Sequence, residues 1–158
     1  MIARRTVFIV LILAAAFGGL ALRPTWAQDD DRARVQIVDA WARVALTRSE
    51  TTAYVTMMNV GGESDRLVGV SSPVAGSAKL EKVGGWGFSM KPREVESVKI
   101  GAARVVKLEP GRTYIHLYEL TQRLEAGKTL PLSLRFQKSG TLYVEAVISN
   151  QELGNRGR

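Results

Sequence analysis

The chain has 158 residues, with 22 Lys and Arg against 15 Asp and Glu, a net charge of +7, one His and no Cys. This length fits a single domain. The lack of cysteine excludes disulfide scaffolds, cysteine-ligated metal centres and thiol catalysis, and a single histidine excludes the usual multi-histidine zinc site.

Residues 1–27 are predicted to be a secretory signal peptide. A positive start with Arg4 and Arg5 precedes an apolar run from Val7 to Leu22, and the small residues Thr25 and Ala27 are placed for cleavage after Ala27. The alternative is an uncleaved membrane anchor, but the run is shorter than the ~20 residues that span a bilayer. We therefore expect a periplasmic protein with no stable membrane insertion after cleavage.

The charge of the exported chain is smaller than the total suggests. Removing Arg4, Arg5 and Arg23 with the leader lowers the net charge from +7 to +4. The remaining basic residues are interleaved with acids and lack an aromatic platform, so we expect no nucleic-acid partner. A weak attraction to anionic lipid or to an acidic partner remains open.

Residues 35–150 are predicted to form one all-β domain, between a flexible N-terminus over 28–34 and a flexible tail over 151–158. Short segments rich in Val, Ile and Thr, separated every ~8–12 residues by Gly, Pro, Asn and Ser turns, are typical of an antiparallel sandwich or barrel. The predicted strands are Val35–Val44, Thr51–Val60, Arg66–Ser72, Ser77–Val83, Phe88–Arg93, Glu96–Ile100, Val105–Leu108, Thr113–Leu120, Leu130–Gln137 and Thr141–Ser149.

Alternation along these strands predicts which side chains share a face. Met57 and Met58 are adjacent in a strand, so one is expected in the core and the other outside it. Tyr114, His116 and Tyr118 are expected to lie on one face of their strand.

Five segments between Val38 and about Val147 have a specific order and spacing: VDAWAR, AYVT, DRLVGVSSPVA, VKLEPG and LPLSLRF. In this order they resemble the PCu(A)C family of periplasmic copper chaperones. The resemblance implies a single cupredoxin-like Greek-key β-barrel or sandwich, and it implies copper as the cargo.

The resemblance also points to candidate ligands. The family binds Cu(I) through two His-x-Met pairs and one further Met, which are soft donors. Here the first pair falls on Glu81 and Val83, the lone Met on Met90, and the second pair on Tyr114 and His116. Met90 keeps the family residue, His116 is a different but competent ligand, and the other three positions are substituted.

Each candidate also has a simpler interpretation. Met90 alone is more often a packing residue, and a lone strand histidine such as His116 is usually half-buried and hydrogen-bonded. Trp86 is a packing residue or forms the rim of the site. Glu81 with Lys82 is predicted to be solvated surface.

These observations favour a monomeric periplasmic copper-chaperone-family protein, which carries Cu(I) or Cu(II) to an acceptor protein through a degenerate, weak site. The alternative is a metal-free interaction or assembly module on the same fold. We expect no enzymatic activity, because the sequence has no nucleophile elbow, phosphate-binding loop or His-Glu-x-x-His motif.

Overall fold

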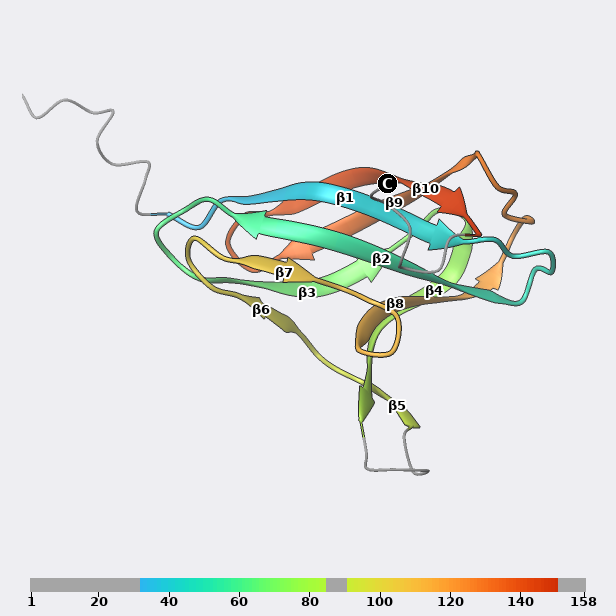
Figure 1. Cartoon of the computed structure of the whole chain (residues 1–158), viewed down its shortest axis with the longest axis horizontal. Helices are drawn as coiled ribbons and strands as arrows, with labels where there is room; N and C mark the ends of the chain where they lie inside the picture. The colour runs from blue at the N-terminus through green and yellow to red at the C-terminus, as the bar shows by residue number, and fades with distance from the viewer. Residues whose placement is uncertain (1–31, 85–90, 151–158) are drawn as a thin grey trace, which may run out of the picture.

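The computed structural model describes residues 32–84 and 91–150, and all regular structure in these ranges is β-strand (Figure 1). These ranges contain no helix that could cross a membrane. The predicted signal peptide over 1–27, the predicted tail over 151–158, Trp86 and Met90 lie outside the described residues. The strands are β1 (Val35–Arg43), β2 (Glu50–Asn59), β3 (Asp65–Ser71), β4 (Ala75–Gly84), β5 (Lys91–Glu94), β6 (Val98–Ile100), β7 (Val105–Lys107), β8 (Thr113–Leu120), β9 (Thr129–Phe136) and β10 (Thr141–Ser149).

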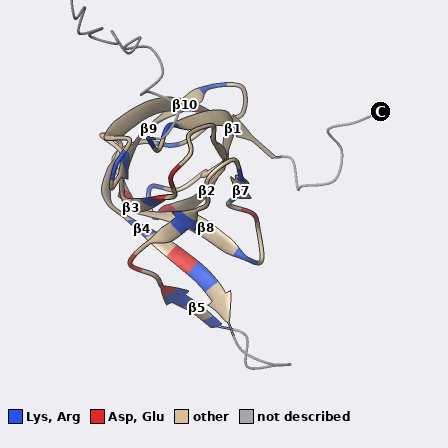
Figure 2. Cartoon of the chain, turned by 90° about the vertical axis from the view of Figure 1, so that its left-hand side faces the viewer, with Lys and Arg blue, Asp and Glu red and all other residues tan. Residues whose placement is uncertain are grey.

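The all-β prediction is confirmed, and the strands form one curled sheet. Their hydrogen-bonded order is β5-β4-β8-β2-β1-β10-β9-β3-β6, with β7 paired to β2. The strands pair antiparallel except that β1 pairs with β10 in parallel. β3 and β4 lie far apart in this order but follow each other directly in the chain. Directly connected strands must lie close in space, so the sheet curls round on itself (Figure 2). The hydrogen-bonded path stays open, with β5 and β6 at its ends.

The sheet encloses the main core with alternate residues of each strand. On β2, Val55 and Met57 are buried, whereas Met58 is 37% exposed on the other face. Ile115 and Leu117 of β8 are fully buried in the same core. The prediction for the adjacent methionines is therefore confirmed.

A second, smaller apolar cluster lies on the outer face of the sheet. It consists of Trp41, Tyr54 and Tyr114, with Val83 packed against it, and the rings of Trp41 and Tyr54 are 4.3 Å apart between centroids. The sequence neighbours of these aromatic residues face the main core, so the aromatic side chains point outward. At Tyr114, β8 is therefore packed on both faces, on one by the main core and on the other by this cluster.

Candidate functional site

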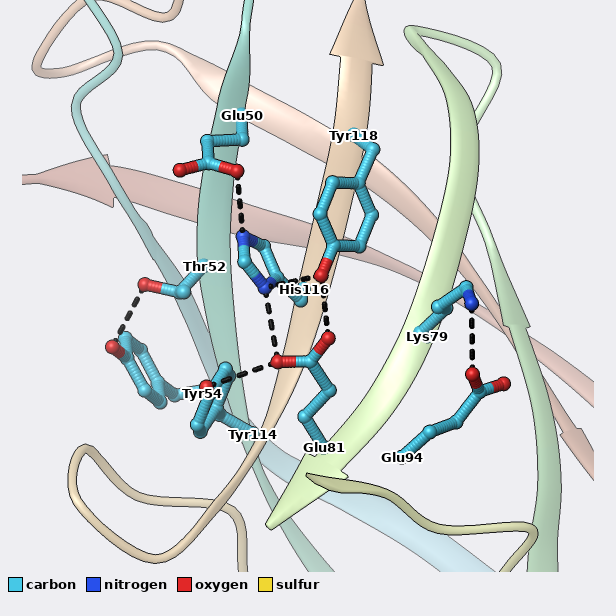
Figure 3. Close-up of polar contacts among 9 residues, drawn as sticks. All are labelled: Glu50, Thr52, Tyr54, Lys79, Glu81, Glu94, Tyr114, His116 and Tyr118. Atoms are coloured by element: carbon cyan, nitrogen blue, oxygen red, sulfur yellow. Dashed lines mark hydrogen bonds and ion pairs between the residues drawn. The ribbon is translucent and has the colours of Figure 1, made fainter. Parts of the chain in front are cut away.

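Four polar side chains converge beside this aromatic cluster, on the outer face of β4 and β8 (Figure 3). Glu81 lies opposite Tyr114 in the ladder that joins the two strands. His116 and Tyr118 follow Tyr114 at alternate positions of β8, so all three project from one face. The prediction that these three residues share a face is confirmed.

The carboxylate of Glu81 is the centre of this group. Its Oε2 accepts hydrogen bonds from the Tyr114 phenol and from Nδ1 of His116, both at 3.0 Å, and its Oε1 accepts a hydrogen bond from the Tyr118 phenol. Glu81 is only 7% exposed, so the prediction that it belongs to the solvated surface is wrong. A buried carboxylate is tolerated here because β8 supplies it with three donors.

These contacts fix the protonation of Glu81 and of the two phenols. Burial by itself would raise the pKa of the Glu81 carboxyl, but the hydrogen bonds from Tyr118, His116 and Tyr114 outweigh it and hold the pKa below its ordinary value of 4.5. Burial and the neighbouring Glu81 raise the pKa of Tyr114 to about 12, and the same causes raise the pKa of Tyr118. At neutral pH the carboxylate is ionised and both phenols keep their protons.

The ring of His116 is held between two carboxylates. Nδ1 faces Glu81 and the Tyr118 hydroxyl, the latter at 2.8 Å, and Nε2 lies 3.3 Å from Oε2 of Glu50. The ring also stacks on Tyr118, with 4.0 Å between centroids. The His116 side chain is 17% exposed and the Glu50 side chain 56% exposed, so the prediction of a half-buried, hydrogen-bonded histidine is confirmed.

The two ring nitrogens of His116 have different surroundings. We assign a proton to Nδ1, because the ionised Glu81 needs a donor there. Nε2 lies beside the exposed carboxylate of Glu50. A positive charge at this position, on the ring or on a bound ion, would be attracted by the Glu50 carboxylate.

The structure brings together most of the positions that the family resemblance marked. Glu81, Tyr114 and His116 form one hydrogen-bonded group, and Val83 packs against the aromatic cluster that includes Tyr114. In the described part of the chain, no three His, Cys, Asp or Glu side chains gather into a group that could hold a metal ion.

Tyr118 and Glu50 contact His116 in the structure but were not predicted as site residues from the sequence. Tyr118 could have been found from the sequence, because it lies two residues after His116 and so projects from the same face of the strand. Glu50 reaches the ring only because β2 pairs with β8 so that Glu50 lies opposite Tyr118. No local sequence pattern predicts this pairing of β2 with β8.

Comparison with known proteins agrees with this fold. A family model described as "Putative lipoprotein LpqE-like" matches residues 35–148. A curated protein named "Putative lipoprotein Lxx21020", from Leifsonia xyli subsp. xyli, is 30% identical over 117 residues, which are 73% of this chain and 70% of that protein.

Solved PCuAC domains have a similar structure. The apo PCuAC domain from PmoF1 has 25% identity and a TM-score of 0.63, and the match covers 78% of this chain and 99% of that domain. The copper-bound PCuAC domain from PmoF2 has 18% identity and a TM-score of 0.62 over 78% of this chain and 98% of that domain. The Cu(I) form of DR1885 from Deinococcus radiodurans has 24% identity and a TM-score of 0.59 over 80% of this chain and 84% of that protein.

These similarities confirm the resemblance to PCu(A)C domains and the cupredoxin-like fold. The family model covers most of the chain, from the start of β1 almost to the end of β10. The chain therefore belongs to the LpqE-like family, with the fold of the PCuAC copper-chaperone domains.

Proposed function

We propose that this protein carries copper outside the cytoplasm and passes it to an acceptor protein. In this proposal the protein is exported to the periplasm after loss of residues 1–27 and acts as a monomer. The fold likeness to copper-bound PCuAC domains supports the cargo. The single observation that carries the proposal is the orientation of His116, whose Nε2 faces the exposed carboxylate of Glu50.

The distance between these two atoms suits a shared metal ion. Nε2 of His116 and Oε2 of Glu50 are 3.3 Å apart. Two donors at this separation can both lie about 2 Å from one first-row divalent ion. Glu81 accepts a hydrogen bond from the other ring nitrogen, as carboxylates behind metal-binding histidines commonly do, and so orients the ligand.

The chemistry of these donors favours Cu(II) over Cu(I). Imidazole and carboxylate suit Cu(II), whereas Cu(I) prefers thioether and thiolate donors. Glu81 thus acts as an orienting residue where the family has a ligand. Met90, the one retained position of the family motif, is proposed as a further ligand that favours Cu(I). With two donors from the described residues, the expected affinity is weak.

A Cu(II) titration followed by electron paramagnetic resonance tests the proposal. The native protein is expected to bind one Cu(II) ion with nitrogen hyperfine structure from one imidazole. His116→Gln should abolish this signal, and Glu50→Gln should weaken binding. Glu145→Gln, an exposed glutamate on β10, is the matched control and should bind as the native protein does. Unchanged Cu(II) binding in His116→Gln would overturn the proposal.

A metal-free interaction module is the second candidate. The observation that favours it is that no buried side-chain nitrogen or oxygen among the described residues lacks a hydrogen-bond partner, so the network around Glu81 is complete without an ion. Titration with Cu(II), and with Cu(I) under reducing conditions using native protein and Met90→Leu, separates the two. Absence of binding by the native protein in both states would favour the second candidate.

A further inference from the structure

The ends of β4 and β5 form a two-stranded arm that extends from the body of the domain (Figure 1). We define the arm as Glu81–Gly84 of β4 with Lys91–Glu94 of β5. Its register pairs Lys82 with Arg93 and Gly84 with Lys91. Figure 2 shows blue basic segments on both strands of the arm, away from the core of the sheet.

The register separates the charges of the arm onto two faces. Directly opposed residues of an antiparallel pair share a face, and so do residues two apart along a strand. One face therefore carries Lys82, Lys91 and Arg93 without an acid, and we call it the cationic face. The Arg93 guanidinium lies over Gly84 on this face, since a Cβ on Gly84 would come within 2.5 Å of it.

The opposite face carries the acids of the arm. It carries Glu81 in the polar group described above and Glu94, which forms a 2.7 Å ion pair with Lys79. All three cations of the cationic face are exposed, and none forms an ion pair with an acid in the described ranges.

This cationic face does not help the fold. Like charges directly opposite each other on neighbouring strands destabilise a β-ladder. Lys82 and Arg93 are such a pair, on a projecting arm with little apolar burial to compensate. An anionic partner against this face would remove the repulsion.

We propose that the cationic face of the arm docks on an anionic phospholipid surface. The relatives are named as lipoproteins, which associate with membranes. This sequence contains no cysteine, so none of its side chains can carry a thioether-linked lipid. Exposed lysine and arginine side chains on a projecting face are attracted to anionic headgroups, and this attraction supplies membrane association by charge.

Vesicle sedimentation tests the proposal. The purified protein is expected to bind vesicles of phosphatidylglycerol mixed with phosphatidylcholine, and this binding should weaken as salt is added. It should not bind vesicles of pure phosphatidylcholine. Each charge removed from the cationic face should lower partitioning about fivefold, so the triple variant Lys82→Gln, Lys91→Gln, Arg93→Gln should lose roughly 100-fold.

The matched control removes the same charge elsewhere. Lys99, Arg104 and Lys107 are exposed and lie on or beside β6 and β7, so their triple substitution by Gln should leave most of the binding intact. The charge-preserving variant Lys82→Arg, Lys91→Arg should bind like the native protein. Equal losses in the two Gln triples would overturn the proposal. Retention on poly-glutamate without any vesicle binding would also overturn it, and would indicate an acidic protein partner.

Discussion

Glu81 and Tyr114 are directly paired across the ladder of β4 and β8, and the Tyr114 phenol donates a 3.0 Å hydrogen bond to the Glu81 carboxylate. Both residues occupy positions that the family resemblance assigned to histidine ligands. The pair is buried and self-sufficient, because Tyr118 and His116 complete the coordination of the carboxylate by hydrogen bonds. The outer face of these strands therefore holds a hydrogen-bonded group at positions where the family resemblance places metal donors.

Tyr114→Phe should destabilise the domain. The substitution leaves the ring in the aromatic cluster but removes one donor from a buried, ionised carboxylate, which costs about 1.5–3 kcal/mol. Urea denaturation of native and variant protein measures the difference. The control is Tyr143→Phe, because Tyr143 is 81% exposed and its hydroxyl should contribute little. Equal stability of native protein and Tyr114→Phe would contradict the role given to the hydrogen bond.

Acid should weaken the fold partly through Glu81. Its folded pKa is lower than its ordinary value of 4.5, so the unfolded chain binds the proton first as pH falls. The stabilisation is therefore complete above about pH 4.5 and is lost as pH falls from there through the folded pKa. Stability measured across this range should fall less steeply for Glu81→Gln than for the native protein. Parallel curves for the two proteins would show that Glu81 does not carry this dependence.

The two adjacent methionines of β2 should differ sharply in their tolerance of truncation. Met57 is fully buried, and Met57→Ala should cost about 2–5 kcal/mol through lost packing and a residual cavity. Met58 is 37% exposed, and Met58→Ala should have a small effect. Thermal or urea unfolding of the two single variants provides the comparison, with each serving as the control for the other. Similar small losses at both positions would contradict the observed burial.

Restoring the family donors should create a Cu(I) site. The variant Glu81→His, Val83→Met, Tyr114→His, His116→Met places imidazole and thioether groups at alternate positions of two paired strands. Each added soft donor strengthens Cu(I) binding, and a gain of several tenfold steps is expected at about 1.4 kcal/mol per step. Competition with a chromophoric Cu(I) chelator measures it, and adding Met90→Leu to the quadruple variant tests the fifth ligand. A folded quadruple variant with no gain would show that these positions cannot share one ion.

Local patterns predict much of the fold. The strands Thr113–Leu120 and Thr141–Ser149 agree with the structure at both ends, because alternation and flanking turn residues are encoded within each segment. The opposite faces of Met57 and Met58 follow from the same two-residue period. Segment by segment, the sequence is sufficient to identify an all-β chain.

The candidate site depends on contacts between distant segments, and there local patterns are insufficient. Glu81 beside Lys82 has the composition of a solvated surface. Its burial arises because β8, more than thirty residues later, pairs with β4 and covers it with Tyr114 and Tyr118. Glu50 likewise meets His116 through the register of β2 with β8. Such registers are tertiary properties, since each one depends on the packing of the whole sheet.

The parallel pairing of β1 with β10 has a consequence for how the domain is made. The first strand finds one of its two neighbours only in the last strand, with Trp41 opposite Val147. A chain that emerges N-terminus first must therefore hold β1 with one edge unpaired until Thr141–Ser149 has emerged. Folding then closes a loop of almost the whole domain, a slow step for β-proteins with distant contacts. We therefore expect the sheet to complete its hydrogen-bonded order only once β10 is available to pair with β1.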